Sequence, residues 1–446
     1  MPARAAPVAV VGGGLAGMAA AARLAKLGHP VHLFERAGAL GGSWRAVEQP
    51  GTGLVDAAPA VLPFPAPWRD LFRKSGRPLE AELARSGHAL VPAADVRHRF
   101  ADGSELILPA ERGAQYAVLS TTYGRPVADR WRDLLDALDD VWQALRPLGL
   151  EHELTGRRRL PRRVRGQLWA RRSVAWLAAS LDEPHLGAVV RSIAHRHGSV
   201  PERTPAWVAV DLAVSRTFGH WRVQAEDPAR HPDDAGRSSV LAEVLAARLA
   251  TRRVTVHLHS TVHGLELEGG RVVGVRTGAG SHRAAGVVVT TDPWHLVDEL
   301  LPRSAGGPLR RRVRRLRPAS APTVSHVRVA EECAEVTETV ELTAAGVPVV
   351  TYRRPVAGGT VLSRHDFTRP VPSPATGVAW HGFRGWLDRP PVSTGVPGLW
   401  TASPSSPGGG GASQVVLSGA LASAACHAAL DPPARSDRSP TTASGP

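Results

Sequence analysis

The sequence contains very little lysine, cysteine and tyrosine. Only two of its 54 basic residues are lysine, so arginine carries nearly all the positive charge behind a formal net charge of +14. Because arginine, alanine, glycine and proline are abundant along the whole chain, this charge reflects the overall composition. The sequence contains no aromatic-studded basic repeat and no recognised nucleic-acid motif. We therefore predict no nucleic-acid partner.

Cys333 and Cys426 are the only cysteines, which excludes a framework of several disulfide bonds and favours the reducing cytoplasm. No run of 18 uncharged apolar residues occurs, so no membrane-spanning helix is predicted. The alanine-rich start after Arg4 resembles a signal peptide, but cleavage there would destroy the strand and helix described next. The hydrophobic content of 43% is enough for a large core. We predict a globular cytoplasmic protein.

The most informative segment lies near the N-terminus, where an apolar strand leads into a glycine-rich turn and a helix. The glycines follow the spacing G-x-G-x-x-G at Gly12, Gly14 and Gly17. The first permits a sharp turn, the second lets the backbone approach a pyrophosphate, and the third lets the helix pack closely on the strand. The next strand ends at Glu35, whose carboxylate is placed to accept hydrogen bonds from a ribose diol. The segment predicts a dinucleotide-binding unit in which free amides of helix 15–27 face the phosphates.

Helical and strand-like segments alternate along the rest of the chain. Residues 129–146 have apolar side chains at spacings of three and four, which predicts an amphipathic helix whose carboxylates form a solvated face. These carboxylates are Asp133, Asp136, Asp139 and Asp140. Residues 238–292 predict a helix, a strand, a hairpin and another strand, and residues 305–395 predict strands separated by proline-rich turns. The tail 431–446 is rich in proline, serine and arginine and is predicted to be disordered.

A second strand, glycine loop and helix closes the chain. Strand 399–402 is followed by the glycine loop 407–411 and by helix 413–430. An open glycine loop lets a flat ring lie against the backbone, beside the positive end of the helix. A reduced flavin carries negative charge near its pyrimidine ring, which such a helix end stabilises. The alternative is a flexible glycine loop that caps a core helix.

Taken together, these segments resemble the bacterial phytoene (carotenoid) desaturases, within the flavin amine oxidase and protoporphyrinogen oxidase superfamily. The motifs that carry the resemblance lie at 12–17, 35, 41–42, 55–59, 100–104, 217–219, 270–272 and 407–419. The resemblance implies an α/β fold in which a glutathione-reductase-like FAD-binding Rossmann domain is interleaved with an α+β substrate domain. The FAD-binding domain would comprise residues 1–92, 236–303 and 392–430. The substrate domain would comprise residues 93–235 and 304–391.

The resemblance also implies a non-covalent FAD whose parts contact separate groups of residues. At the pyrophosphate these residues are Gly12, Gly14, Leu15, Ala16 and Gly17, with Gly42 and Ser43. At the adenosine they are Glu35, Arg36 and Val262, the last through its backbone. At the flavin they are Ala58, Pro59, Gly409, Gly410, Gln414, Val415 and Val416.

The implied activity is hydride transfer between an apolar isoprenoid or polyene-like substrate and the flavin. Oxygen, a quinone or another polyene would be the electron acceptor. An amine oxidase is disfavoured, because relatives of that kind use a lysine in the later sheet strands and an aromatic cage. This chain has no lysine after Lys74 and only three tyrosines. Protoporphyrinogen-like oxidation stays open, since it also needs a roomy apolar cavity.

Three positions depart from the family's pattern and motivate a further alternative. Ser43 stands where many relatives have arginine or lysine, and Ser403 stands where several have an acidic residue. Gly236-Arg237 replaces a Gly-Gly step, behind a polar stretch at 224–235. The alternative is a degenerate relative that binds FAD, or no flavin at all, and acts without catalysis as a partner in a biosynthetic assembly.

The sequence identifies no catalytic acid or base and no metal site. It contains no Ser-His-Asp set and no metal-ligand run. Surface or packed roles, and not metal binding, are predicted for its grouped histidines, the last three of which lie on or after one predicted strand. These histidines are His195, His197, His257, His259 and His263.

Arginine is interleaved with tryptophan and leucine over residues 157–177. This composition on a helical stretch suits an anionic lipid surface, from which an apolar substrate would be drawn. It predicts peripheral contact with the inner face of the membrane. The alternative is an ordinary helix in an arginine-biased protein.

Overall fold

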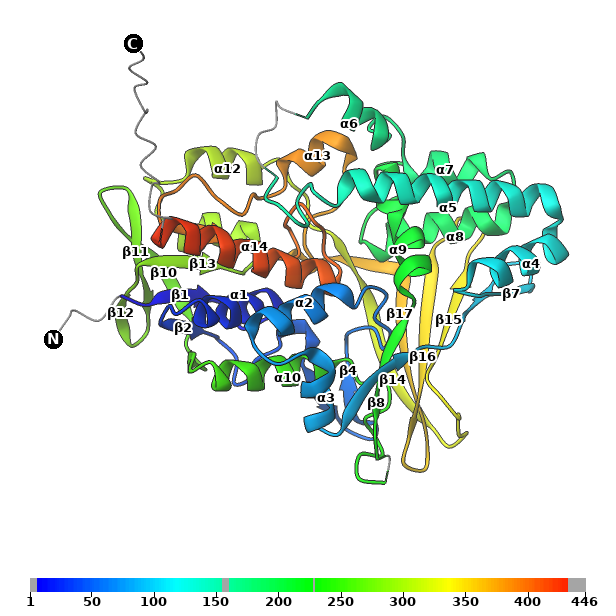
Figure 1. The fold of residues 1–446 in the computed structure, drawn as a ribbon, viewed down its shortest axis with the longest axis horizontal. Coiled ribbons are helices and arrows are strands. Elements are labelled where there is room, and N and C mark those ends of the chain that lie inside the picture. Colours follow the sequence, from blue (N-terminus) through cyan, green and yellow to red (C-terminus); the bar gives the residue numbers. More distant parts are fainter. Residues whose placement is uncertain (1–5, 155–159, 228, 432–446) are drawn as a thin grey trace, which may run out of the picture.

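Two sheets organise the protein, one parallel and one mixed, and helices cover both (Figure 1). The structure is a computed structural model that describes residues 6–154, 160–227 and 229–431. The parallel sheet has five strands in the order β18-β13-β1-β2-β9. The mixed sheet has six strands in the order β14-β17-β16-β15-β6-β7. The tail predicted to be disordered lies, beyond residue 431, outside the described residues.

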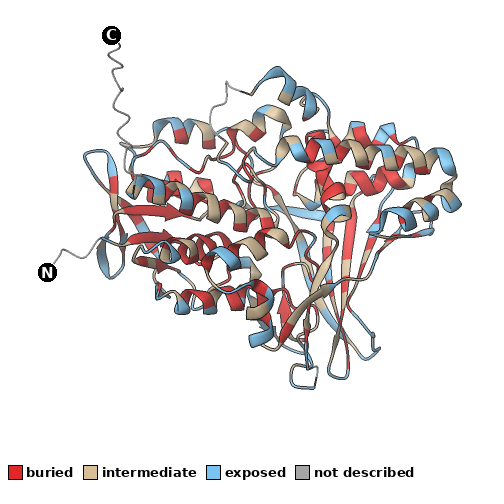
Figure 2. Ribbon diagram, viewed as in Figure 1, coloured by how far each residue is buried: buried red, intermediate tan, exposed pale blue. Residues whose placement is uncertain are grey.

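The parallel sheet is formed by short strands from distant parts of the chain. They are β1 (Val8–Val11), β2 (Val31–Phe34), β9 (Thr255–His257), β13 (Gly286–Val289) and β18 (Leu399–Thr401). Strands β1 and β13 are buried along their whole length, which explains why they are uniformly apolar or glycine (Figure 2). Alternate side chains enter different cores: Val8 and Val10 pack among helices, whereas Ala9 and Val11 pack against a β-layer.

One face of this sheet is covered by helices. They are α1 (Leu15–Lys26), α2 (Ala66–Ser75), α3 (Leu79–Arg85), α10 (Ser239–Thr251) and α14 (Ala412–Leu430). Helices α1 and α14 approach closely because Gly419 has no side chain: a Cβ there would lie 2.3 Å from the carbonyl oxygen of Ala16. Helix α14 is also the one helix of the described residues that is long and apolar enough to cross a membrane. The sequence analysis predicted none. A core helix meets the same criteria, and α14 packs one face against the core, so the finding is weak evidence for a span.

The other face is covered by a small antiparallel sheet and short helical turns. The strands are β10 (Val262–Glu268), β11 (Arg271–Thr277) and β12 (Gly280–Arg283). The turns are α11 (Pro293–His295), η3 (Leu296–Leu300) and α12 (Gly307–Val313). The predicted hairpin is present, and both Gly269 and Gly270 have positive φ at its tip.

The mixed sheet forms the second part of the protein. Its strands are β6 (Val96–Arg99), β7 (Glu105–Leu108), β14 (Ser320–Val329), β15 (Thr337–Leu342), β16 (Pro348–Val356) and β17 (Gly359–Pro372). Only the β6–β15 pair is parallel among the described strands of this sheet.

A group of helices shares one core with the mixed sheet. These are α4 (Arg112–Tyr123), α5 (Arg125–Leu145), α7 (Val174–Ser180), α8 (Pro184–Arg196), η2 (Ala206–Ala209) and α9 (Val210–Phe218). Helix α5 is the predicted amphipathic helix, and its acidic face is occupied by ion pairs: Asp136 and Asp139 both contact Arg216. None of the four carboxylates singled out by the sequence analysis lines the cavity described below.

The two parts are connected by an antiparallel pair, β5 (His88–Pro92) with β8 (Trp221–Ala225). Shorter elements complete the chain. They are η1 (Gly42–Trp44), β3 (Ala46–Gln49), β4 (Gly53–Asp56), α6 (Arg162–Gln167), η4 (Pro374–Thr376) and α13 (Gly382–Asp388). Strand β5 belongs to the predicted FAD-binding domain and strand β8 to the predicted substrate domain. The domain boundaries stay a prediction.

Candidate functional site

In the glycine turn between β1 and α1, neither the backbone conformation nor the packing of the protein requires glycine at position 14. Gly12 has φ of +104°, and a Cβ on Gly17 would lie 1.9 Å from the Gly12 carbonyl oxygen. These two positions therefore need glycine for the turn and for helix packing. Gly14 has an extended backbone (φ −74°), and a Cβ there would meet nothing within 4 Å. Free space at Gly14 is where a ligand can approach the backbone.

The N-terminus of α1 presents donors to this space. The first helical hydrogen bond runs from the Met18 amide to the Gly14 carbonyl, at 2.9 Å. The amides of Leu15, Ala16 and Gly17 precede it, and such amides are left without helical acceptors at every helix start. Gly14 offers no side-chain cap. The predicted pyrophosphate residues thus lie together at the positive end of a helix.

Glu35 orders the same turn from the end of β2. Its Oε2 accepts a hydrogen bond from the Gly13 amide at 2.6 Å, and its Oε1 accepts one from the Ala37 amide at 2.8 Å. The Ser260 amide donates to the Glu35 carbonyl at 2.8 Å, which brings the chain leading to Val262 beside it. The adenosine residues predicted from the sequence therefore come together, with Arg36 exposed on the outside.

Helix η1 connects the glycine turn to a large cavity. The Gly41 amide donates to the Gly13 carbonyl at 2.9 Å, and a Cβ on Gly42 would lie 3.1 Å from the Gly14 Cα. Ser43 is exposed, and Trp44 lines the cavity. The two predicted phosphate segments, 12–17 and 42–43, are thus adjacent in space.

The cavity has a volume of about 590 Å³ and lies where the N-terminus of α14 meets the helices of the second part. Aromatic and aliphatic side chains form much of its wall. They include Phe64, Trp131, Leu135, Ile193, Trp221 and Trp380. Of the predicted flavin residues, Pro59, Gly410 and Gln414 line the cavity. Ala58, Gly409, Val415 and Val416 are buried behind this wall.

A buried arginine holds the glycine loop that precedes α14. Arg389 is 2% exposed and donates to the carbonyl oxygens of Val378, Ser406 and Pro404 at 2.7, 2.9 and 3.0 Å. Its guanidinium lies 4.2 Å from the centroid of the Trp380 ring. Burial lowers the pKa of Arg389 to about 9, so the side chain stays charged at pH 7. The sequence analysis missed this residue, because one arginine among many carries no local signal.

Ser403, which replaces an acidic residue of relatives, also orders this loop. Its hydroxyl oxygen accepts a hydrogen bond from the Ser405 amide at 3.1 Å, and its own amide donates to the Ser406 hydroxyl at 3.1 Å. The serine therefore performs a structural task for which an acceptor oxygen is sufficient.

The cavity also has a polar wall that the sequence analysis did not identify. His98 is buried, and its burial, with the nearby charge of Arg196, lowers its pKa to about 4. The ring is therefore neutral at pH 7, and its Nδ1 has no hydrogen-bond partner among the described residues. Arg196 pairs with the buried Glu338 at 3.2 Å. The sequence could have indicated His98, because it lies two residues from the apolar Val96 on strand β6 and so faces the same, inward side.

His197 also lines the cavity, and its Nε2 lies 2.7 Å from Asp211 Oδ2. The sequence analysis predicted a packed or surface role for it, and its ring does pack edge-on against Trp380 at the cavity wall. His257 does have a packed role: its ring stacks on Phe34 with centroids 4.6 Å apart.

Comparison with known proteins agrees with this arrangement. Residues 10–75 match the family of NAD(P)-binding Rossmann-like domains. A hydroxyneurosporene desaturase of Cereibacter sphaeroides is 28% identical over 299 residues, which cover 65% of this chain and 57% of the relative. A phytoene dehydrogenase of Streptomyces griseus is 36% identical over 138 residues, 30% of this chain and 26% of the relative. The matched segments thus span less than two thirds of either relative.

Among solved structures, cyclohexylamine oxidase from Brevibacterium oxydans has a TM-score of 0.63 at 14% identity. The match covers 95% of this chain and 98% of the oxidase chain. This likeness concerns the fold alone. The interleaved α/β fold predicted from the sequence is confirmed, as are the resemblance to carotenoid desaturases and the Rossmann-type nucleotide domain.

Proposed function

We propose that the protein is an FAD-dependent oxidoreductase that acts on an apolar, isoprenoid- or polyene-like substrate. The observation that carries this proposal is the closeness of the two sites. Helix η1 lies beside Gly14 at Gly42, and its Trp44 lines a cavity of about 590 Å³ whose wall contains many apolar and aromatic side chains. A dinucleotide at the turn would therefore extend its reactive end into a space suited to an apolar substrate.

The described residues fit a non-covalent FAD. The open space at Gly14 and the free amides of α1 suit the pyrophosphate, and the Glu35 carboxylate suits a ribose. Gly410 and Gln414 lie where the N-terminus of α14 meets the cavity. When bound, FAD supplies a hydride acceptor at the flavin.

The remaining tasks fall to the protein itself. The aromatic wall would align an apolar chain and exclude water from it. Desaturation removes a hydride and a proton from adjacent carbons. We propose that His197, which lines the cavity and is oriented by Asp211 at 2.7 Å, accepts this proton.

The lining argues against amine oxidation by the route that uses a lysine and an aromatic cage with tyrosine. Neither lysine nor tyrosine is present among the described residues that line the cavity. Protoporphyrinogen-like oxidation and a non-catalytic flavin-binding partner stay as the alternatives. The first would require the same cavity to accept a macrocycle.

The visible spectrum of the purified protein tests the proposal first. We expect a flavin spectrum, release of free FAD on heating, and anaerobic bleaching of the flavin by a polyene or isoprenoid extract. A quinone or oxygen should then restore the colour. A colourless protein that does not bind added FAD would contradict the proposal that FAD is the cofactor. A bound flavin that no apolar extract reduces would favour the non-catalytic alternative.

We also propose peripheral contact with an anionic membrane through helices α6 and α7. Residues 157–159 of the predicted segment lie outside the described residues. Within the described part, Trp176 is 42% exposed, and Arg172 lies 4.3 Å from the centroid of its ring. This pairing of a cation with an exposed aromatic side chain suits the headgroup region of a bilayer.

Vesicle sedimentation tests this contact. At low salt we expect binding to anionic vesicles, little binding to neutral ones, and release as salt screens the charges. Trp176→Ser should weaken binding, whereas Leu258→Ser, at another exposed apolar residue, should not. Equal binding by both variants and the unchanged protein would contradict the contact through α7.

A further inference from the structure

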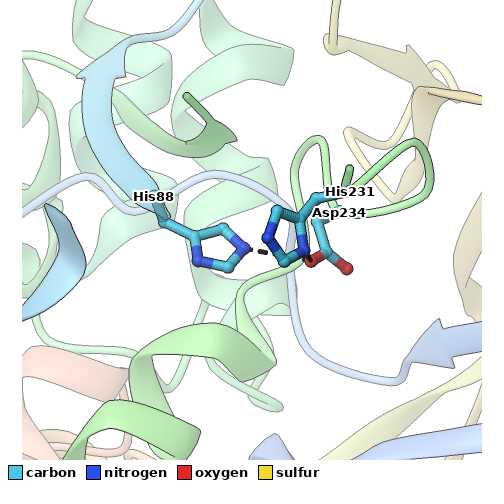
Figure 3. A group of neighbouring side chains, drawn as sticks. All are labelled: His88, His231 and Asp234. Carbon is cyan, nitrogen blue, oxygen red and sulfur yellow. Dashed lines mark hydrogen bonds and ion pairs between the residues drawn. The ribbon is translucent and has the colours of Figure 1, made fainter. Parts of the chain in front are cut away.

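A cluster of two histidines and an aspartate lies away from the cavity, beside the β5–β8 pair (Figure 3). His88 begins strand β5, and His231 and Asp234 come from the polar stretch that follows β8. The ligand atoms of the three side chains all lie within 4.8 Å of one another. We propose that these residues form a Zn²⁺ site, independent of the proposed flavin chemistry.

Both histidine rings converge on one carboxylate oxygen. His88 Nε2 lies 3.0 Å from Asp234 Oδ2, and His231 Nδ1 lies 3.3 Å from the same atom. Two imidazole nitrogens and one carboxylate oxygen are a ligand set that zinc takes, with water in a fourth position.

The Ser86 hydroxyl lies beside the ring nitrogen of His88 that faces away from the carboxylate. It donates to the Leu83 carbonyl at 2.8 Å and lies 3.2 Å from His88 Nδ1. In the tautomer in which Nδ1–H donates to this hydroxyl, the lone pair of Nε2 faces Asp234 and is available to a metal ion.

The two imidazole rings have centroids 5.2 Å apart, close enough for one divalent ion to bind a nitrogen of each ring and the carboxylate oxygen. A hydrogen bond from the second nitrogen of a metal-ligating histidine, as Ser86 provides, is the usual support for such a site.

The charge balance around Asp234 leaves its carboxylate available to a cation. Arg237 contacts the other carboxylate oxygen of Asp234, which orients the group. The charge of Arg237 is offset by Glu243, whose Oε1 lies 2.6 Å from its Nη2. Arg237 therefore does not fully neutralise the negative charge of Asp234.

The cluster is also accessible to an ion. The side chain of His88 is 6% exposed and that of Asp234 is 15% exposed, whereas His231 is 39% exposed. The site therefore opens to solvent at His231, which gives an entry path and room for a water ligand. A bound ion would link β5 to the segment before α10.

Zinc content and zinc affinity of the full chain, prepared without a histidine tag, test the site. We expect one zinc per chain by elemental analysis after gel filtration, and a thermal midpoint that rises with added zinc. In competition with a chromophoric chelator, His231→Ala should lower zinc affinity by more than about 100-fold. Ser86→Ala, which removes only the supporting hydroxyl, should lower it about 10-fold.

His427→Ala is the matched control. His427 Nδ1 lies 2.9 Å from His29 Nε2, so it is also a paired histidine, but it lies outside the cluster. Its substitution should leave zinc affinity unchanged. Equal zinc affinity in the unchanged protein, His231→Ala and Ser86→Ala would overturn the proposal and leave the cluster as histidine–carboxylate contacts without a metal. If His231→Ala does not fold, Ser86→Ala decides between these outcomes, and neither readout depends on flavin.

Discussion

Replacement of Gly14 by alanine should lower the affinity for FAD about 100-fold while the thermal midpoint of the FAD-free protein stays unchanged. A Cβ at this position meets no atom of the protein within 4 Å, and the backbone conformation suits alanine. The added methyl group would instead occupy the space proposed for the pyrophosphate. Loss of two charge-assisted hydrogen bonds there would cost about 3 kcal/mol, which corresponds to about 100-fold in Kd. Fluorescence titration with FAD measures the change.

Two control variants separate ligand binding from folding. Gly278→Ala introduces a methyl group at another open glycine, in the β11–β12 turn, and should change neither affinity nor stability. Gly17→Ala should destabilise the protein even without FAD, because its Cβ would lie 1.9 Å from a carbonyl oxygen. Unchanged FAD affinity in Gly14→Ala would place the cofactor elsewhere.

Arg389→Met should lower the free energy of unfolding by about 3 kcal/mol and weaken FAD binding. The substitution keeps most of the apolar stem but leaves three carbonyl acceptors without their donor, each worth about 1 kcal/mol or more. Two of them, on Pro404 and Ser406, belong to the loop that precedes α14. Loss of Arg389 would therefore loosen the predicted flavin loop as well as the core. Chemical denaturation, with and without FAD, measures both effects.

Arg384→Met is the matched control, since Arg384 lies exposed on α13, the helix that ends immediately before Arg389. Its unfolding free energy and FAD affinity should match those of the unchanged protein. The unfolding free energy and FAD affinity of Arg389→Lys should lie between those of Arg389→Met and Arg384→Met. Lysine keeps the charge but lacks the planar set of donors that reaches separate carbonyls. Equal stability of Arg389→Met and Arg384→Met would show that the three hydrogen bonds contribute little.

The nucleotide-binding unit was predictable because its signals are local. The spacing of Gly12, Gly14 and Gly17, the apolar β1, and Glu35 after β2 lie within one short segment. Backbone geometry or close packing requires Gly12 and Gly17, and the spacing of Gly14 relative to them is the sequence signal for a bound pyrophosphate. Helix α5 and the Gly269-Gly270 hairpin were predictable for the same reason, since periodicity and turn preference act over a few residues.

The cavity wall and the proposed zinc site depended on tertiary structure. His98 and Arg196 face one cavity although about a hundred residues separate them, and His88 and Asp234 meet over a separation of 146 residues. Arg389 differs from the many other arginines only in being buried among carbonyl groups. The sequence by itself determined where the chain turns and which faces are apolar, because those properties are local. Which polar side chains share a buried space was decided only by packing, because it depends on contacts between distant segments.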